Sequence, residues 1–419
     1  MKVRGAVRPP GDKSISHRAL MLAALARGTS ALTGLLTGAD VKSTAHVLRQ
    51  LGAEISPIRD GVAVRISRAP LTAPRARLHC GNSGTTARLV LGILAGQQFA
   101  ATLTGDASLR RRPMRRVTEP LRAMGAEITQ LGDTLPVTIR GGRLRDLTYT
   151  SPVASAQVKS AILFAALTGR VAATIREPYR SRDHTERLFA HLGLDIHDRA
   201  GAIVFAPAVR PSGLPALDLS IPGDISSAAF LVAAAVLADA GELVVENVGV
   251  NPTRTGALVV LARMGAPVDR INLRDAGGEP VADLVVRPAA LRGTDVTAAE
   301  VPTLVDEVPI LAVLASRARG QTVFREVGEL RVKESNRLEL VAANLRAVGV
   351  KAEAQGNDLH VEGGDAPPRG RVDTAHDHRL AMAFAVLGTL RGAKITLSER
   401  QSVAISYPDF FRDLRICCA

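Results

Sequence analysis

The chain has 419 residues, of which 46% are hydrophobic. This length predicts two to three domains, each with a core of its own. The sequence contains no apolar run long enough to span a membrane. The net charge is +13, but the 53 Lys and Arg residues are spread along the chain among acidic residues, and only three Tyr, nine Phe and no Trp are present. This pattern argues against a nucleic-acid binder, which needs a basic stripe and aromatic platforms, and favours small anionic ligands.

The first element to stand out is PGDKSISHRALMLAALARGTS, from Pro10 to Ser30, in which Lys13, Ser14 and Arg18 crowd the start of an apolar helix. A helix N-terminus carries free N–H groups and the positive end of the macrodipole, so cations gathered there repel one another until an anion binds. The stretch therefore predicts an anion site. A Ser N-cap with solvated basic neighbours is the alternative.

Six Ala- and Leu-rich helical runs, each closing near a Gly, recur at intervals of roughly 70 residues. They begin at Arg18, Thr86, Val158, Ser227, Glu307 and His378. After five of them a second, amphipathic helix ends in a Gly that predicts a C-cap before a strand, as in LRQLGAEI and LRAMGAEI. Short strands such as GVAVRIS and LPVTIRG complete the repeats.

Six βαβ-type units predict an α/β protein with three units in each of two similar domains. The apolar helices, uncharged nearly all round, are expected to form the inner layer, with sheets and amphipathic helices outside. PGDKS at Pro10 and PGDIS at Pro222 mark the expected join. We expect a first domain over 10–221 and a second over 222–419, completed by the N-terminal strand of 1–9, with the ligand site in the cleft between them.

Polar clusters like the one at Lys13 stand at the starts of other predicted helices. They are GNSGTTAR, SAQVKS, SRDHTER, RVKESNR and HDHR. The Gly, Ser and Thr residues of GNSGTTAR favour a backbone N–H nest for an anion, without the Lys of a P-loop. Arg18, Arg112, Arg337 and Arg379 supply planar forks that suit phosphate or carboxylate. Together the clusters predict a site for polyanions.

Carboxylates accompany these cations. Asp306 and Glu307 stand at the start of the fifth apolar helix, and Glu334 lies between Lys333 and Arg337, so acid–base chemistry is predicted at the same site. The alternative for Glu334 is an i,i+3 pair with Arg337 on a solvated face. His378 is either a general acid or a hydrogen-bonded histidine at a helix start.

Seven motifs, in order from about Lys2 to Pro408, resemble those of the 5-enolpyruvylshikimate-3-phosphate (EPSP) synthase family, the 3-phosphoshikimate 1-carboxyvinyltransferases. They are PGDKSISHRALMLAAL, GNSGTTAR, RRPM, SAQVKSAILFAAL, PGDISSAAFLVAAA, RVKESNRL and DHRLAMAFAVLG. The resemblance implies the enolpyruvyl-transferase fold: two inside-out α/β domains, each of three βαβαββ units.

The same resemblance implies a reaction. The family transfers the enolpyruvyl group of phosphoenolpyruvate to the 5-hydroxyl of shikimate 3-phosphate and releases phosphate, in the shikimate pathway of aromatic amino acid biosynthesis. It uses no metal and no organic cofactor, and we expect none here. The family is usually monomeric, so a monomer is expected.

The resemblance also assigns site residues by their place in the motifs. Lys13 is implied to touch both substrates. The other residues implied to hold shikimate 3-phosphate are Ser14, Arg18, Ser155, Ala156, Gln157, Arg182, Asp306 and Lys333. Those implied to line the phosphoenolpyruvate site are Gly84, Arg112, Arg337 and Arg379. For catalysis it implies Asp306 as the base, Glu334 as the shuttle for the C3 proton, and Lys13 as the proton donor to the departing phosphate.

One position departs from the family pattern. Some members carry a Lys just before the final PDF turn, where this chain has Ile405 and Ser406, so no phosphoenolpyruvate contact is assigned there.

The nearest alternative is the related UDP-N-acetylglucosamine enolpyruvyl transferase, which shares the fold and the donor. It typically carries a Lys-Asn pair near its start and a Cys on a mobile loop, whereas this chain has DKSISHR, and Cys80 directly precedes GNSGTT. Cys80, Cys417 and Cys418 match no disulfide framework or metal-ligand spacing. Because the start of the chain also lacks the character of a signal or transit peptide, a cytoplasmic protein is expected.

Overall fold

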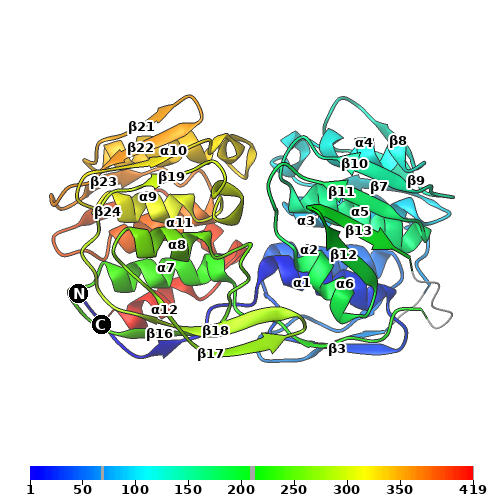
Figure 1. Cartoon of the computed structure of the whole chain (residues 1–419), viewed down its shortest axis with the longest axis horizontal. Coiled ribbons are helices and arrows are strands. Elements are labelled where there is room, and N and C mark those ends of the chain that lie inside the picture. Colours follow the sequence, from blue (N-terminus) through cyan, green and yellow to red (C-terminus); the bar gives the residue numbers. More distant parts are fainter. Residues whose placement is uncertain (68–69, 208–212, 419) are drawn as a thin grey trace. The chain divides into compact units, whose positions relative to one another are not determined.

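Two compact units make up the chain in the computed structural model, which describes residues 1–67, 70–207 and 213–418. Unit 1 comprises Met1–Pro10, Pro222–Asp275 and Pro280–Ala419, and unit 2 comprises Gly11–Ile221 and Ala276–Glu279. The backbone therefore leaves unit 1 after Pro10 and returns to it after Ile221, as can be followed by colour in Figure 1. Ala419, the last residue of the expected second domain, lies outside the described residues.

Unit 2 repeats one connectivity. The first complete repeat runs through β6 (Leu78–His79), α3 (Gly84–Ala95), β7 (Ala100–Thr104), α4 (Arg115–Ala123), β8 (Glu127–Gln130) and β9 (Val137–Arg140). In its sheet, ordered β6-β7-β9-β8, β6 and β7 are parallel and the other pairs are antiparallel. The next repeat has the same pattern with β10 (Leu147–Thr150), α5 (Ala156–Gly169), β11 (Ala173–Arg176), α6 (His184–His191), β12 (Asp195–Arg199) and β13 (Ala202–Ala206). Each is a βαβαββ unit.

The N-terminal repeat of unit 2 takes its first strand from the far end of the unit. Its chain-order elements are α1 (Lys13–Leu25), β3 (Thr29–Thr33), α2 (Ala39–Gln50), β4 (Glu54–Ile55) and β5 (Val64–Ser67). β14 (Asp218–Ser220) pairs in parallel with β3 and completes the order β14-β3-β5-β4.

The first repeat of unit 1 also takes its first strand from a distant part of the chain. β2 (Ala6–Val7) pairs in parallel with β16 and supplies the first strand to α7 (Ile225–Val236), β16 (Leu243–Gly249), α8 (Gly256–Arg263), β17 (Asp269–Ala276) and β18 (Glu279–Val286). The second repeat contains β19 (Asp295–Val296), α9 (Val308–Ala315), β20 (Gln321–Phe324), α10 (Arg337–Ala347), β21 (Ala352–Gln355) and β22 (Asp358–Glu362). The last contains β23 (Arg369–Val372), α11 (His378–Leu387), β24 (Lys394–Leu397) and α12 (Phe410–Cys417). The predicted α/β class is thus confirmed.

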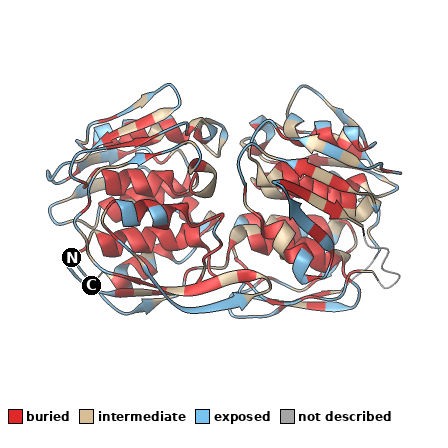
Figure 2. Ribbon diagram, viewed as in Figure 1, coloured by how far each residue is buried: buried red, intermediate tan, exposed pale blue. Residues whose placement is uncertain are grey.

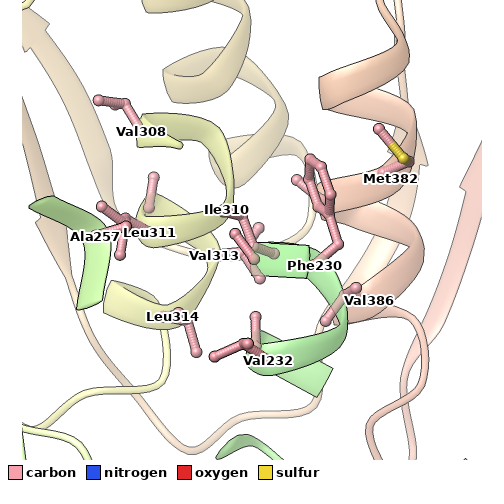
Figure 3. Packing of buried hydrophobic residues seen from close by; sticks show 14 of the residues in the cluster. Phe230, Val232, Ala257, Val308, Ile310, Leu311, Val313, Leu314, Met382 and Val386 are labelled. Atoms are coloured by element: carbon pink, nitrogen blue, oxygen red, sulfur yellow. The ribbon is translucent and has the colours of Figure 1, made fainter. Parts of the chain in front are cut away.

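The predicted inner layer of apolar helices is present in each unit. All twelve residues of α7 and all eight of α9 are buried, and these helices appear almost wholly red in Figure 2. Phe230 of α7, Ile310 of α9 and Met382 of α11 belong to one hydrophobic cluster, seen closely in Figure 3. Because such helices have no polar face, only their ends can carry chemistry.

Glycines end the amphipathic helices as predicted. Directly after the cap residues of α2, α4, α6, α8 and α10 the chain reaches a Gly with positive φ; these are Gly52, Gly125, Gly193, Gly265 and Gly349. A residue with a Cβ is strained in this left-handed conformation, so Gly is favoured where the helix must turn into the next strand.

Candidate active site

The start of α1 is capped by an acid. The Asp12 side chain accepts a hydrogen bond from the Ile15 amide at 2.9 Å, so the predicted alternative of a Ser N-cap is wrong. Nor are the basic neighbours solvated, since Arg18 is only 3% exposed. Lys13 Nζ lies 3.2 Å from Asp40 Oδ2, a partner that no sequence motif predicted. The helix start therefore holds cations that are fixed in place.

Arg18 connects the starts of three helices. Its Nη1 donates to the Ser14 carbonyl at 2.9 Å, its Nε to Thr185 Oγ1 at 2.7 Å and its Nη2 to Ser160 Oγ at 2.7 Å. Burial lowers the pKa of Arg18 to about 10, which still leaves the guanidinium charged at neutral pH. Arg182 lies close enough for its charge to contribute to that lowering. Its three hydrogen-bond partners are neutral, so none of these bonds neutralises the guanidinium, although the Glu186 and Asp12 charges act on it from nearby.

His17 forms a second, neutral connection. Its Nδ1 is 2.6 Å from Thr44 Oγ1, which is 2.6 Å from Thr86 Oγ1, so α1, α2 and α3 are joined below their starts. Burial, with the charges of Lys13 and Arg18, holds the pKa of His17 well below its ordinary value. The imidazole is therefore uncharged at neutral pH and can accept or donate one hydrogen bond at Nδ1.

Two guanidinium groups lie over the start of α3. Ser83 caps the helix by accepting from the Thr86 amide at 3.2 Å. A Cβ placed on Gly84 would lie 2.8 Å from Arg88 Nη1 and 3.5 Å from Arg112 Nη1, so the glycine leaves room for both side chains. Arg112 Nη2 donates to Asn82 Oδ1 at 2.5 Å. The start of α3 thus has two arginine side chains beside it, while the N–H nest stays a prediction.

The start of α5 is tied to the start of α3. Ser155 is the N-cap residue of α5 and Ala156 is its first residue. Gln157 Oε1 accepts from Arg88 Nη1 at 2.7 Å, and Gln157 Nε2 donates to Thr85 Oγ1 at 3.0 Å. Arg88 was not among the predicted site residues, and its only signal was its place at the end of GNSGTTAR. Of the residues predicted for unit 2, Lys13, Ser14, Gly84, Ser155, Ala156 and Gln157 lie at helix starts. Arg112 follows a 3-10 turn and approaches the start of α3 through its side chain, and Arg182 lies in the loop before α6.

In unit 1 the central cation is Arg337, which is 1% exposed. Its Nε donates to Asp377 Oδ2 at 2.8 Å, and its Nη2 lies 2.7 Å from Glu334 Oε2. Burial alone would lower the pKa of Arg337, but the carboxylates of Asp377 and Glu334 outweigh it and raise the pKa. The i,i+3 pair with Glu334 forms, but the alternative of a solvated face is wrong because Arg337 is buried.

Asp306 lies among three cations of unit 1. Its Oδ1 is 3.4 Å from Arg337 Nη1 and 3.9 Å from Lys333 Nζ, and its Oδ2 is 3.7 Å from Arg379 Nη2. The Asp306 carbonyl also accepts from Arg379 Nη1 at 3.0 Å. All five residues predicted for this unit, Asp306, Lys333, Glu334, Arg337 and Arg379, therefore form one cluster.

Asp377 holds this cluster together and was missed as a site residue. It caps α11 by accepting from the Arg379 amide at 2.9 Å, and Ser335 Oγ donates to its Oδ2 at 2.9 Å. Burial alone would raise the pKa of Asp377, but the Arg337 charge outweighs burial and holds the pKa below its ordinary value. Next to it, His378 is buried with Nδ1 4.0 Å from Asp377 Oδ1, at the helix start where the sequence placed it.

The position without the family Lys is partly enclosed. Ile405 ends a 3-10 turn (Gln401–Ile405), and Ser406 follows it with 6% of its surface exposed. Within the described ranges 1–67, 70–207 and 213–418, no three His, Cys, Asp or Glu side chains are grouped to hold a metal ion. No helix in those ranges is long and apolar enough to cross a membrane.

Comparisons with known proteins match this arrangement over nearly the whole chain. The family model of EPSP synthase (3-phosphoshikimate 1-carboxyvinyltransferase) matches residues 1–414. A 3-phosphoshikimate 1-carboxyvinyltransferase from Thermus thermophilus is 48% identical over 421 residues, covering 100% of this chain and 97% of the relative. One from Geobacter metallireducens is 43% identical, covering 98% and 95%.

Solved structures agree. The EPSP synthase from Acinetobacter baumannii superposes with a TM-score of 0.87 at 39% identity, covering 99% of this chain and 96% of that one. The enolpyruvyl transferase NikO from Streptomyces tendae shares the fold, with a TM-score of 0.78 at 20% identity and coverage of 99% and 95%. The architecture is thus that of the enolpyruvyl transferases.

The chain belongs to the EPSP synthase family. The family inferred from the seven motifs is confirmed, and so are the enzyme class and the enolpyruvyl-transfer reaction of the shikimate pathway that follow from it.

Proposed function

We propose that the two cation clusters act together on the substrates of this reaction, binding phosphoenolpyruvate and shikimate 3-phosphate while the enolpyruvyl group passes to the 5-hydroxyl and inorganic phosphate is released. The observation that carries this proposal is the convergence of buried or half-buried cations on the starts of α1, α3, α5 and α6 in unit 2, next to helix N–H groups. Both substrates are small polyanions, which such helix starts attract.

Shikimate 3-phosphate is proposed to bind mainly in unit 2. Arg18 has a fixed orientation because three neutral partners hold it, and the α5 start offers the hydroxyl of Ser155, the backbone of Ala156 and the amide of Gln157. Lys13, Ser14 and Arg182 complete this set, with Asp306 and Lys333 contributed by unit 1. Neutral and cationic donors of this kind suit a phosphate monoester and ring hydroxyls.

Phosphoenolpyruvate is proposed to bind to groups of both units. Arg112 lies over the start of α3, where Gly84 allows close approach, and Arg337 and Arg379 supply two further forks. Lys13 is shared with the acceptor. A phosphate and a carboxylate on one small molecule need several bidentate partners, which arginine provides better than lysine.

Four proton transfers are proposed, and three side chains carry them. As the 5-hydroxyl oxygen attacks C2 of phosphoenolpyruvate, Asp306 takes the hydroxyl proton and Glu334 delivers a proton to C3, which becomes a methyl group. In the second step C3 returns a proton to Glu334 while the C2–phosphate oxygen bond breaks, with Lys13 protonating the departing phosphate. The carboxylates of Asp306 and Glu334 both contact Arg337, 3.4 Å and 2.7 Å away, so they share one anchor.

A cytoplasmic monomer is proposed as the working form. Cys80, Cys417 and Cys418 are free thiols, which suits a reducing compartment. A single chain also supplies every residue named for both substrates. Light scattering of the purified protein tests the monomer, and a mass of two chains would contradict it.

The test of the reaction is release of inorganic phosphate by the purified chain given both substrates, with each substrate alone as the control. The proposal predicts release only with both, and a product whose proton spectrum contains the vinyl CH₂ of an enol ether. Release with UDP-N-acetylglucosamine in place of shikimate 3-phosphate would favour the related transferase. Well-folded protein without release would contradict the proposal.

A further inference from the structure

A buried ion cluster adjoins the segments that carry Ser155 and Arg182. Lys159, one turn into α5, has a side chain that is 1% exposed. Its Nζ lies 3.0 Å from Glu177 Oε2 and 2.7 Å from Glu186 Oε1, and it donates to the Ser181 carbonyl at 3.3 Å. None of these four residues has a part in the reaction steps above.

Glu177 connects two separate segments through one carboxylate. Its Oε1 accepts from the Ser155 amide at 3.0 Å and from Ser181 Oγ at 2.7 Å. Its Oε2 accepts from the Ser181 amide at 3.3 Å and faces Lys159. The N-cap of α5 and the loop that leads into Arg182 are therefore held by the same side chain, which is only 7% exposed.

The charges of this cluster do not by themselves favour an anion nearby. One ammonium faces two carboxylates, and burial raises the pKa of Glu186, so the cluster offers no excess positive charge to a phosphate. A cluster selected only to attract a phosphate would not include a second carboxylate. The contacts of Glu177 therefore indicate a geometric role, in which the carboxylate orients donors rather than meeting the ligand.

We propose that Glu177, anchored by Lys159, is a positioning residue for shikimate 3-phosphate. It fixes the start of α5 and the Ser181–Arg182 segment so that Ser155 and Arg182 reach the substrate together. The proposal rests on the proposed function, because it names the substrate whose binding depends on Glu177. Small displacements of such donors weaken binding strongly, since the hydrogen bonds are directional.

The test is the Glu177→Gln variant of the full chain, which keeps the side-chain shape but replaces one acceptor oxygen with a donor and removes the charge. Initial rates of phosphate release are measured while each substrate is varied in turn. We expect the KM for shikimate 3-phosphate to rise about tenfold, with the KM for phosphoenolpyruvate and kcat within about twofold of the wild type. Glu127→Gln, on the exposed surface of β8, is the matched control and should change neither KM.

Three results would overturn the proposal. An unchanged KM for shikimate 3-phosphate would mean that Glu177 does not position the site. A lower KM would mean that its charge merely repels the substrate. A lower melting temperature and a smaller active fraction with both KM values unchanged would mean a purely structural role. If Glu177→Gln does not fold, Ser181→Ala, which keeps the ion cluster but removes one of its partners, should raise the same KM by a smaller factor, and no rise would overturn the proposal.

Calorimetric titration with shikimate 3-phosphate alone separates this proposal from the reaction. A wild type that binds the substrate but releases no phosphate would contradict the proposed function, and the Kd of Glu177→Gln would then decide the positioning role. A wild type that binds no shikimate 3-phosphate would overturn both.

Discussion

His17 is a buried residue next to Lys13 and Arg18 whose protonation is expected to influence stability. Burial beside Lys13 and Arg18 holds its pKa below the ordinary value of 6.5, so the unfolded chain takes up a proton at a higher pH than the folded chain does. The contribution of neutral His17 to the free energy of unfolding is therefore retained above about pH 6.5. It is lost as the pH falls below that value, by up to about 1.4 kcal/mol per pH unit. Urea unfolding at pH 7.5, 6.5 and 5.5 measures this slope.

The neutral variant His17→Asn should flatten the slope over that range, because Asn cannot titrate yet can still bond Thr44. His197→Asn, at a side chain that is 57% exposed, should leave the slope as in the wild type. An equal slope in His17→Asn and the wild type would show that His17 is not the group responsible.

At the residue scale, the sequence identified groups but not their partners. Lys13, Arg18, Arg337 and Arg379 could be selected because their motifs place cations at helix starts. Asp377 lies in HDHR at a helix start, but its pairing with Arg337, 40 residues away in the chain, depends on the tertiary fold and could not be predicted. Glu177 likewise reaches Ser155 across 22 residues and had no local signal. Charge pairs that are distant in sequence are invisible to periodicity and capping rules.

At the element scale, close helix packing rests on single glycines. A Cβ added to Gly92 of α3 would lie 2.2 Å from the carbonyl oxygen of Ala161 in α5, a backbone atom that cannot move without the helix. Gly92→Ala should therefore destabilise the protein by about 1–3 kcal/mol. Gly142→Ala, where a Cβ meets nothing within 4 Å, should change stability little. Equal stability of both variants in urea unfolding would contradict this packing.

The positions and ends of the helices were predicted well from the sequence. The amphipathic helices α2, α4, α6, α8 and α10 end at a Gly with positive φ, and apolar helices such as α7 and α9 are buried all round, so periodicity and composition were enough to place them. The first strands of two repeats come from far along the chain. We expected the N-terminal strand of 1–9 to complete the second domain, and β2 pairs in parallel with β16. No local signal indicated that β14 pairs with β3.

At the scale of the whole molecule, the proposed reaction needs groups from both units. We expect substrate anions to offset the repulsion among the cations and so favour a more compact molecule. Small-angle scattering should show a smaller radius of gyration when both substrates are present. An unchanged radius with both substrates bound would contradict substrate-driven closure.

The central claim is that one reaction depends on both clusters, and the most direct measurement is kcat for phosphate release in Lys13→Met and Glu334→Gln. These variants change unit 2 and unit 1 respectively, and Lys42→Met and Glu353→Gln, at exposed positions, are their matched controls. We predict that each site variant loses about 10²–10³-fold in kcat while both controls keep the wild-type rate. Wild-type turnover in either folded site variant would contradict the claim.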